Sequence, residues 1–562
     1  MQDLKRTKAQ LSREAIERLY IAMRHLFIRG SYKPLGVSGE AMIEALQALE
    51  PEIYGSINDP EKVELDGLFY VFQRLPQGIE ECRYIKLISR EGFETSNFKA
   101  IVPAKRRREC YRIDDEQMFI EMTRGRSDIY DILTHLTFLY IEAEKIRENS
   151  INHRQEKRRE WLMLEEIVLN EEKEESFDRK VAYTYLSTIL GRTYDETLMA
   201  SKRFTNATKV NSLFHITYWL GRLSMDEHFE KNDREITFSS SLRENLGHHI
   251  YGELWAQRIK KYLQDEDLLD RPIHIISANL HSVMNSLYGT AAKVSKKSAS
   301  LESIAGILSV EKNDDLRDKV ETFALKNGMH HIGDNSGTNI SVQIYDTAQL
   351  DLSTLPKEIT YNESYIKKEN PVILVMNYAF GEQAYETMDE LLKPYDWKSD
   401  KIKLNIESIS IMGKAGILDG DKGDIMIPTA HVFEGTADNY PFVNDFSVED
   451  FEGHGIKVVG GPMITVMGTS LQNKDILRYF KLSSWRVIGL EMEGAHYQKA
   501  IQAASKIRNS ISSKVTIRYA YYASDNPLMT GKTLASGALG LDGVKPTYLI
   551  TQLILERILH PS

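Results

Sequence analysis

Cysteine is almost absent from this sequence, which has two, Cys82 and Cys110, in 562 residues. Neither lies in a Cys-x-x-Cys motif, so a disulfide framework is excluded and both are expected to be buried thiols. No segment approaches the roughly 18 uncharged apolar residues of a membrane span. The N-terminus, Met1-Gln2-Asp3-Leu4-Lys5-Arg6, has no apolar signal core. We therefore expect a cytoplasmic protein that does not enter a membrane.

Positive charge is not in excess either. The 71 lysines and arginines are outnumbered by 81 acidic residues, giving a formal net charge of -10. Nucleic-acid binding needs a basic face that displaces counterions, so it is not expected. We interpret the basic run Lys105-Arg106-Arg107-Arg108 as a solvated loop rather than an anion site. The pairs His248-His249 and His330-His331 lack a third ligand at metal spacing, so we predict neither a metal nor a cofactor.

The chain is longer than one hydrophobic core usually supports, so we predict two domains. Residues 1–270 are predicted to be a mainly helical domain, because large apolar residues recur at helical spacing at 16–27 and 129–140. Short loops or a small β element are expected around Val71 and at 84–88. Asp270-Arg271-Pro272 marks the boundary, since proline disfavours helix in the preceding residue.

Residues 271–562 alternate strand-like runs with helical patterns, which by itself predicts an α/β domain with a parallel sheet flanked by helices on both faces. Helices are expected at 495–504 and 546–559. The strand candidates are 273–278, 340–344, 372–376, 406–412, 425–428, 458–459, 464–466, 487–490 and 515–522.

Two acidic motifs follow two of these strands. Residues 489–494 read Gly-Leu-Glu-Met-Glu-Gly after one apolar strand, and Ser524-Asp525-Asn526-Pro527-Leu528 follows the next. Carboxylates at the carboxyl ends of neighbouring parallel strands converge on the crevice where open α/β sheets bind ligands. We therefore expect the two motifs to form one site.

These motifs resemble the signature of the purine nucleoside phosphorylase and nucleosidase superfamily, and Ser524-Asp525-x-Pro527-Leu528 looks most like that of AMP nucleosidases. Three further segments are similar to family motifs and fall in the same order: 371–381, 409–418 and 422–425. The resemblance covers roughly residues 270 to 562. It implies a nucleoside phosphorylase-like mixed central sheet, closed in part into a barrel, and cleavage of a purine nucleotide or nucleoside.

The resemblance also assigns roles. Asp525 would protonate or hydrogen-bond the purine N7, and Glu493 would accept hydrogen bonds from the ribose 2′ and 3′ hydroxyls. To donate a proton, Asp525 needs apolar surroundings that exclude water and raise its pKa. Tyr519, Tyr521, Tyr522 and Leu528 are expected to provide them. Taken alone, an aspartate in this position is also typical of a turn or helix cap. The remaining substrate-binding candidates are Met492, Glu491, Gly381, Gly413, Lys414 and Ser524, with Glu491 equally compatible with a solvent-facing residue.

The residues leave two acceptors of the ribosyl group open, water and phosphate. Phosphorylases of this superfamily carry an arginine just before the central glycine motif, whereas 409–413 has none. This departure favours water, although Lys414 is an alternative point charge for phosphate. Asn279 or His281 would orient water, or be plain turn residues. Purine nucleoside phosphorylase activity and a non-catalytic nucleotide sensor or scaffold with a degenerate site therefore remain as alternatives.

A nucleotide substrate needs a pocket for its phosphate. Thr530 and Lys532 offer a hydroxyl and an ammonium close to Asp525, although a mobile loop is an equal interpretation. The expected partners are a purine nucleotide or nucleoside and, for a phosphorylase, phosphate. By resemblance we also expect a homo-oligomer in which the helical domain serves regulation or assembly.

Overall fold

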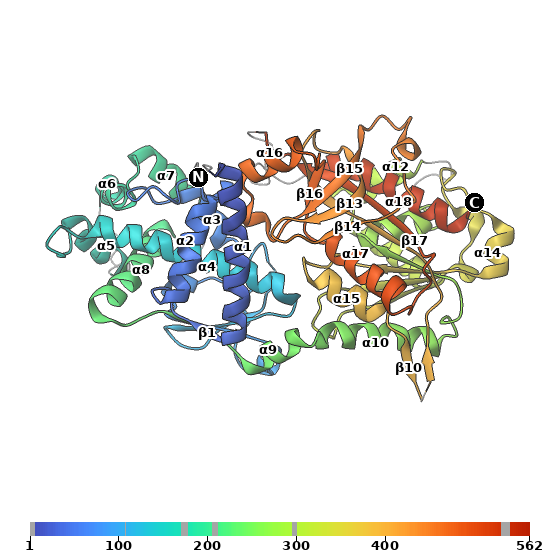
Figure 1. Cartoon of the computed structure of the whole chain (residues 1–562), viewed down its shortest axis with the longest axis horizontal. Coiled ribbons are helices and arrows are strands. Elements are labelled where there is room, and N and C mark those ends of the chain that lie inside the picture. The colour runs from blue at the N-terminus through green and yellow to red at the C-terminus, as the bar shows by residue number, and fades with distance from the viewer. Residues whose placement is uncertain are drawn as a thin grey trace, which may run out of the picture. The chain divides into compact units, whose positions relative to one another are not determined.

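The computed structural model describes residues 6–106, 108–169, 178–204, 212–294, 300–398, 400–529 and 540–561. The chain forms two compact units. The first comprises Met1–His248 with Gly468–Ile476, and the second comprises His249–Met467 with Leu477–Ser562. Figure 1 shows the helices of the first unit in blue to green and the sheet of the second in green to red. Within the described ranges, no helix is both long and apolar enough to cross a membrane.

The division between the units lies earlier in the chain than the predicted boundary at residue 270, because helix α10 (Ile250–Asp265) packs within the second unit. Trp255 Nε1 donates a 2.9 Å hydrogen bond to the carbonyl of Ile340. The buried Lys260 ammonium donates to two carbonyl oxygens at the end of α15 (Gln383–Leu391), at 2.7 and 2.8 Å. A buried ammonium needs such partners, so α10 is anchored to the second unit.

The first unit is mainly helical, as predicted. Helix α1 (Lys8–Arg29) begins at a Thr7 capping box and ends at Gly30, whose φ of 89° suits glycine. Helix α4 (Gly125–Ser150) is buried along nearly its whole length, which accounts for its apolar stripe at 129–140. The other α-helices are α2 (Val37–Leu49), α3 (Leu65–Phe72), α5 (Arg159–Leu169), α6 (Arg179–Leu190), α7 (Tyr194–Arg203), α8 (Leu213–Met225) and α9 (Ser240–Gly247).

A five-stranded sheet accompanies these helices, in the order β1-β5-β2-β4-β3. The strand predicted at 84–88 is confirmed as β2 (Tyr84–Ile88). The β element predicted at Val71 is wrong, because Val71 lies in α3, where Leu68, Val71 and Phe72 share one buried helical face. The other strands are β1 (Ser31–Tyr32), β3 (Cys110–Arg112), β4 (Gln117–Glu121) and β5 (Glu235–Phe238).

The basic run at 105–108 is only in part the solvated loop that we predicted, because Lys105 is exposed whereas Arg106 and Arg108 form ion pairs, and residue 107 lies outside the described residues. Arg108 is 2% exposed, and its guanidinium contacts Asp128 at 2.8 Å and Asp131 at 2.6 Å. Arg106 pairs with Asp131 at 3.1 Å. Both carboxylates come from the start of α4, so a sequence-local basic run is neutralised by acids from a distant helix. Both cysteines are buried free thiols, as expected.

The second unit is built on a ten-stranded mixed sheet, in the order β14-β13-β15-β16-β12-β6-β9-β8-β7 with β17 off this path. Strand β17 pairs parallel with β12 and antiparallel with β13. It thereby closes β13, β15, β16, β12 and β17 into a ring. The strands are β6 (Ile273–Ser277), β7 (Met329–Ile332), β8 (Val342–Asp346), β9 (Val372–Met376), β12 (Ile406–Ile417), β13 (Ile425–Phe433), β14 (Asn439–Pro441), β15 (Val458–Thr465), β16 (Gly489–Glu491) and β17 (Thr516–Asp525).

Helices cover both faces of this sheet (Figure 1). Along β6, Ile275 packs into a core shared with α10, α15 and α17 (Gly494–Gln502), and Ile276 packs into a core shared with the helices of the other face. Those helices are α11 (Leu280–Tyr288), α12 (Leu301–Leu308), α13 (Asp314–Leu325) and α18 (Val544–Leu559). The predicted fold class, a mixed α/β sheet flanked by helices after a mainly helical region, is confirmed. The unit also contains α14 (Glu363–Glu369), α16 (Lys474–Leu482, which begins in the first unit) and the hairpin of β10 (Tyr395–Trp397) and β11 (Asp400–Ile402).

Candidate active site

The two acidic motifs meet across β12 rather than on neighbouring parallel strands. Strand β17 runs parallel to β12 and places Asp525 opposite Gly416. Strand β16 runs antiparallel to β12 and places Leu490 opposite the same Gly416. The predicted geometry of adjacent parallel strands is therefore wrong, but both motifs reach the same stretch of β12. This stretch lies within 409–418, the segment that resembles the central glycine motif of the family.

Asp525 is a buried carboxyl group with one free oxygen. It is 2% exposed, and Oδ1 lies 2.7 Å from the Ser524 hydroxyl, which also lies 3.2 Å from the carbonyl of Ala415. Within the described residues Oδ2 has no hydrogen-bond partner. Burial raises the pKa of Asp525, and the Ser524 hydroxyl with the charges of Lys422 and Lys414 opposes that rise only in part. The pKa of Asp525 is therefore shifted in the direction that a proton donor needs.

Glu493 lies just beyond the end of β16, at the N-cap of α17. Its Oε1 accepts a 3.0 Å hydrogen bond from the backbone amide of Gly381. Gly381 follows β9 in a left-handed conformation, with φ 54°, which favours glycine. Burial and the neighbouring charge of Glu491 raise the pKa of Glu493 from its ordinary 4.5 to about 7. Glu493 therefore changes its charge near neutral pH.

Both oxygens of Glu491 are used inside the protein. Oε2 accepts from the backbone amides of Glu493, at 2.5 Å, and Gly494, while Oε1 accepts from the Thr465 hydroxyl. Oε1 also lies 3.4 Å from Nδ1 of His431. Burial alone would raise the pKa of Glu491, but His431, Thr465 and the Gly494 amide together lower it. Glu491 therefore holds the start of α17, and with it Glu493, in place.

His431 and two tyrosines are site residues that the motifs did not reveal. The His431 ring, on β13, is fully buried and stacks on Phe442 with a centroid distance of 5.3 Å. Tyr519 and Tyr521, predicted only as an apolar wall, lie beside it with buried hydroxyls. Among the described residues these hydroxyls and the ring nitrogens of His431 have no hydrogen-bond partner. The only feature of the sequence that could have identified His431 as a site residue is a histidine within an apolar strand.

An open cavity of about 970 Å³ lies next to the acids. Its wall includes Lys414 from β12, Tyr522 from β17 and, beyond the end of β6, Asn279 and His281. Asp525 and Glu493 do not belong to the described wall, but the charge of Lys414 lowers the pKa of both. Lys414 is exposed. Lys414 therefore lines the cavity and also acts on the charge of both acids.

The remaining predicted residues occupy varied positions. Met492 is buried between the two glutamates. Gly413 lies opposite Tyr521 in the pairing of β12 with β17. Asn279 accepts a hydrogen bond from the amide of His281 and caps α11, the turn role that we left open. Thr530 and Lys532 lie outside the described residues.

No metal centre accompanies these residues. In the part of the chain that the structure describes, no group of three or more His, Cys, Asp or Glu side chains is placed to hold a metal ion.

The chain belongs to a family of unknown function, DUF6909, whose model matches residues 40–303 and 307–560. No functionally curated protein matches the sequence significantly. Among solved structures, the chain is similar to 5′-methylthioadenosine/S-adenosylhomocysteine nucleosidase from Campylobacter jejuni (10% identity, TM-score 0.31, covering 51% of this chain and 99% of that one). It is also similar to purine nucleoside phosphorylase from Toxoplasma gondii (14% identity, TM-score 0.30, covering 52% of this chain and 93% of that one). A third similar structure is futalosine hydrolase from Helicobacter pylori (12% identity, TM-score 0.28, covering 50% of this chain and 98% of that one). Similarity at this level does not transfer an activity to this chain.

Proposed function

We propose that this protein cleaves the N-glycosidic bond of a purine nucleotide or nucleoside, with water as the acceptor. The observation that carries the proposal is Asp525, a buried carboxyl group with a raised pKa whose Oδ2 has no hydrogen-bond partner among the described residues. A departing purine gains negative charge unless it is protonated, so cleavage needs an acid beside the base. A carboxyl group whose pKa is raised by burial is suited to this role.

Glu493 is proposed to bind the sugar. Cleavage gives the ribosyl group oxocarbenium character, and a carboxylate on the sugar hydroxyls stabilises that charge. One oxygen of Glu493 is held by the amide of Gly381, which fixes the orientation of the other. Because the pKa of Glu493 is about 7, this carboxylate forms as the pH rises through neutrality. Activity is therefore expected to increase between about pH 6 and 8.

Water is the proposed acceptor because β12 carries no arginine before Gly413 to hold a phosphate. A second candidate, phosphorolysis, is favoured by one observation, the exposed ammonium of Lys414 on the cavity wall. The two reactions give different products, since hydrolysis releases a free sugar and phosphorolysis a sugar 1-phosphate. Phosphate dependence of base release separates them.

The test is a screen of purine nucleosides and 5′-nucleotides for free base, with and without inorganic phosphate. The proposal expects base release that does not depend on phosphate and that falls strongly in Asp525→Asn. Release that requires phosphate would instead identify a phosphorylase. Binding without release from any compound would refute an enzymatic role and leave a nucleotide-sensing protein.

A further inference from the structure

Helix α17 is not capped by its own N-cap residue. Glu493 occupies the N-cap position, but its side chain makes no capping hydrogen bond. An N-cap side chain usually accepts a hydrogen bond from one of the first amides of its helix. In α17 the carboxylate of Glu491 takes this role, because its Oε2 accepts from the amides of Glu493 and Gly494. The Glu493 carboxylate is therefore not used for capping, and it accepts from the amide of Gly381 instead.

Thr465, at the end of β15, completes the cap. Its hydroxyl donates to Oε1 of Glu491, and its oxygen accepts a 3.0 Å hydrogen bond from the amide of Ala495. One carboxylate and one hydroxyl thus hold three successive amides, those of residues 493–495, at the start of α17. A carboxylate accepts at both oxygens, whereas a protonated carboxyl group donates at one of them. This set of hydrogen bonds therefore uses Glu491 in its ionised form.

His431 faces the same carboxylate from β13. Its Nδ1 lies 3.4 Å from Oε1 of Glu491, and neither side chain is more than 1% exposed. The separation is slightly longer than the roughly 2.7 to 3.2 Å of an N–H···O hydrogen bond, so the contact is that of an ion pair. Gly494 permits this approach, because a Cβ there would lie 2.4 Å from Nδ1. In both protonation states of the imidazole, Nδ1 can carry the hydrogen that faces Glu491.

The other titratable groups around the two glutamates do not replace His431. Within the described residues, those that interact electrostatically with Glu491 or Glu493 are Lys414, His496, Tyr497, Tyr519 and Tyr521. Burial raises the pKa of the three tyrosines, so their hydroxyls stay neutral. Burial lowers the pKa of His496 to about 4, so this imidazole is neutral near pH 7. Lys414 is exposed, and its charge acts on Glu493.

We propose that His431 is a positioning residue that keeps Glu491 ionised, so that Glu491 caps α17 and the Glu493 carboxylate is presented to the sugar hydroxyls. The presentation to a sugar rests on the proposed function, whereas the effect of His431 on the two glutamates does not. The charge of Glu491 is the largest cause, after burial, that raises the pKa of Glu493. His431 therefore also sets the pH at which Glu493 ionises.

Two kinds of substitution separate the Nδ1–H of His431 from its ring. His431→Phe keeps an aromatic ring for the stack on Phe442 but removes the donor. His431→Asn removes the ring but keeps an N–H donor at the position of Nδ1. A packing role predicts that phenylalanine is the better replacement, whereas the proposal predicts that asparagine is. His431→Leu is a second variant without the donor, for use if His431→Phe does not fold.

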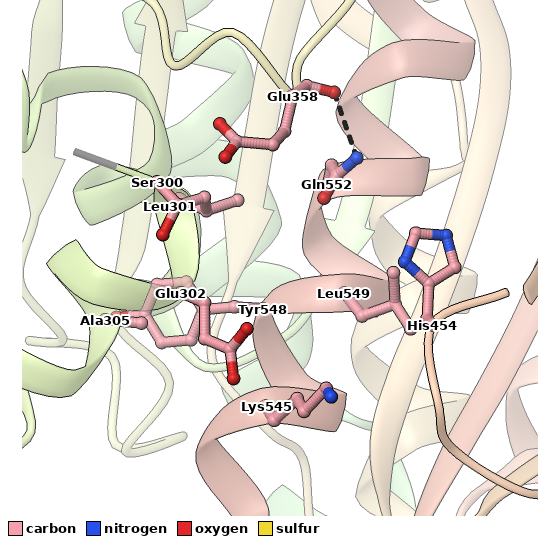
Figure 2. A pocket seen from close by; sticks show the side chains of 10 residues that line it. All are labelled: Ser300, Leu301, Glu302, Ala305, Glu358, His454, Lys545, Tyr548, Leu549 and Gln552. Atoms are coloured by element: carbon pink, nitrogen blue, oxygen red, sulfur yellow. Dashed lines mark hydrogen bonds between the residues drawn. The ribbon is translucent and has the colours of Figure 1, made fainter. Parts of the chain in front are cut away.

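The same substitutions at His454 control for the loss of a histidine. His454 is exposed and lines a separate pocket of about 170 Å³ (Figure 2). The described wall of that pocket contains neither Glu491 nor Glu493. His454→Phe and His454→Asn are therefore expected to leave both measurements unchanged.

The first measurement needs no substrate. Glu493→Gln is introduced into the parent chain and into each His431 variant, and the resulting change in Tm is followed by calorimetry from pH 4.5 to 8. Near pH 7 the gain in Tm is expected to fall by roughly a third to a half in His431→Phe, because Glu491 then retains a proton more readily and repels Glu493 less. The gain is expected to persist in His431→Asn. Equal gains in every background overturn the proposal.

The second measurement is base release from purine ribosides and 2′-deoxyribosides. His431→Phe is expected to lower kcat/KM for ribosides roughly tenfold to a hundredfold, because Glu493 is no longer held in place. The rising limb of its pH profile is expected to move to lower pH by about half a unit to one unit. His431→Asn is expected to keep the parental profile, and 2′-deoxyribosides, which lack one hydroxyl for Glu493, are expected to lose less. Parental kinetics in His431→Phe overturn the proposal.

The two measurements distinguish failure of this inference from failure of the proposed function. A reduced gain in Tm in His431→Phe, without base release from any compound, supports the action of His431 on the glutamates and refutes the proposed function. Base release together with additive changes in Tm leaves the proposed function standing and overturns the role of His431.

Discussion

Replacing Glu493 by glutamine is expected to stabilise the protein at alkaline pH while impairing the proposed catalysis. The folded state raises the pKa of Glu493 from 4.5 to about 7, so it retains a proton that the unfolded chain has already lost. Stability therefore falls as the pH rises through this window, and the loss is complete above about pH 7. Glutamine removes the charge and keeps an acceptor for the amide of Gly381.

The magnitude follows from the two pKa values. A tenfold change in proton affinity corresponds to about 1.4 kcal/mol, so the change from 4.5 to about 7 corresponds to at most about 3.5 kcal/mol. Glu493 is partly exposed, and water screens part of its repulsion with Glu491. We therefore expect Glu493→Gln to gain about 1 to 3 kcal/mol at pH 8 and almost nothing at pH 4.5. In thermal unfolding this gain is a rise of a few degrees in Tm.

Glu491→Gln is the matched control, because the same chemical change two residues away has the opposite expected sign. The pKa of Glu491 is lowered, so its charge contributes stability above its ordinary pKa of 4.5 and loses it as the pH falls through the folded value. Its glutamine variant should unfold at a lower temperature at pH 8. The assay is calorimetric unfolding of both variants and the parent chain from pH 4.5 to 8. Equal signs at pH 8, or a pH-independent effect of Glu493→Gln, would refute this electrostatic reasoning.

Three further predictions concern single side chains. Asp525→Asn should reduce base release roughly 10²- to 10⁴-fold with an unchanged circular dichroism spectrum, because the amide donates no proton; near-parental turnover contradicts its role. Gly494→Ala should lower stability by about 1 to 3 kcal/mol in urea titrations, because its Cβ would lie 2.3 Å from Cε1 of His431. The control Gly306→Ala, with nothing within 4 Å, should be neutral or stabilising, and equal losses would contradict the contact argument. Arg108→Met should lower the stability of the first unit by about 3 to 5 kcal/mol, because two buried carboxylates lose their partner; a fully soluble variant with unchanged unfolding would count against this.

The strands most readily predicted were those buried on both faces. Strand β9 has five consecutive buried apolar residues between clear breaks, and the predicted range 372–376 is confirmed. Strand β15 was predicted as two pieces, because Gly460-Gly461-Pro462 is typical of a turn. Pairing with β13 on one side and β16 on the other keeps this segment extended. Tertiary pairing therefore overrides the local signal.

The sequence predicted only part of the candidate site, because the rest depends on tertiary pairing. The motifs identified Asp525 and Glu493, and the strands that lead to them, β17 and β16, both pair with β12. Their relative strand directions are set by closure of the ring through β17, which is a long-range property. Nothing local distinguishes His431 from any histidine packed in a strand, since its contact with Glu491 spans distant segments. Long-range partners also explain the error at Arg108.

The segment Gly468–Ile476, which belongs to the first unit, affects the order in which the protein matures on the ribosome. Asn473 donates a 2.7 Å hydrogen bond to the carbonyl of Leu49, and Glu52 donates its amide to the carbonyl of Gln472 at 2.9 Å. At roughly 5 to 20 residues per second, translation from residue 248 to residue 476 takes on the order of ten to forty-five seconds. During that interval the N-terminal unit has emerged without its final segment. The N-terminal unit therefore completes its fold only when most of the second unit, which contains the candidate active site, has been synthesised.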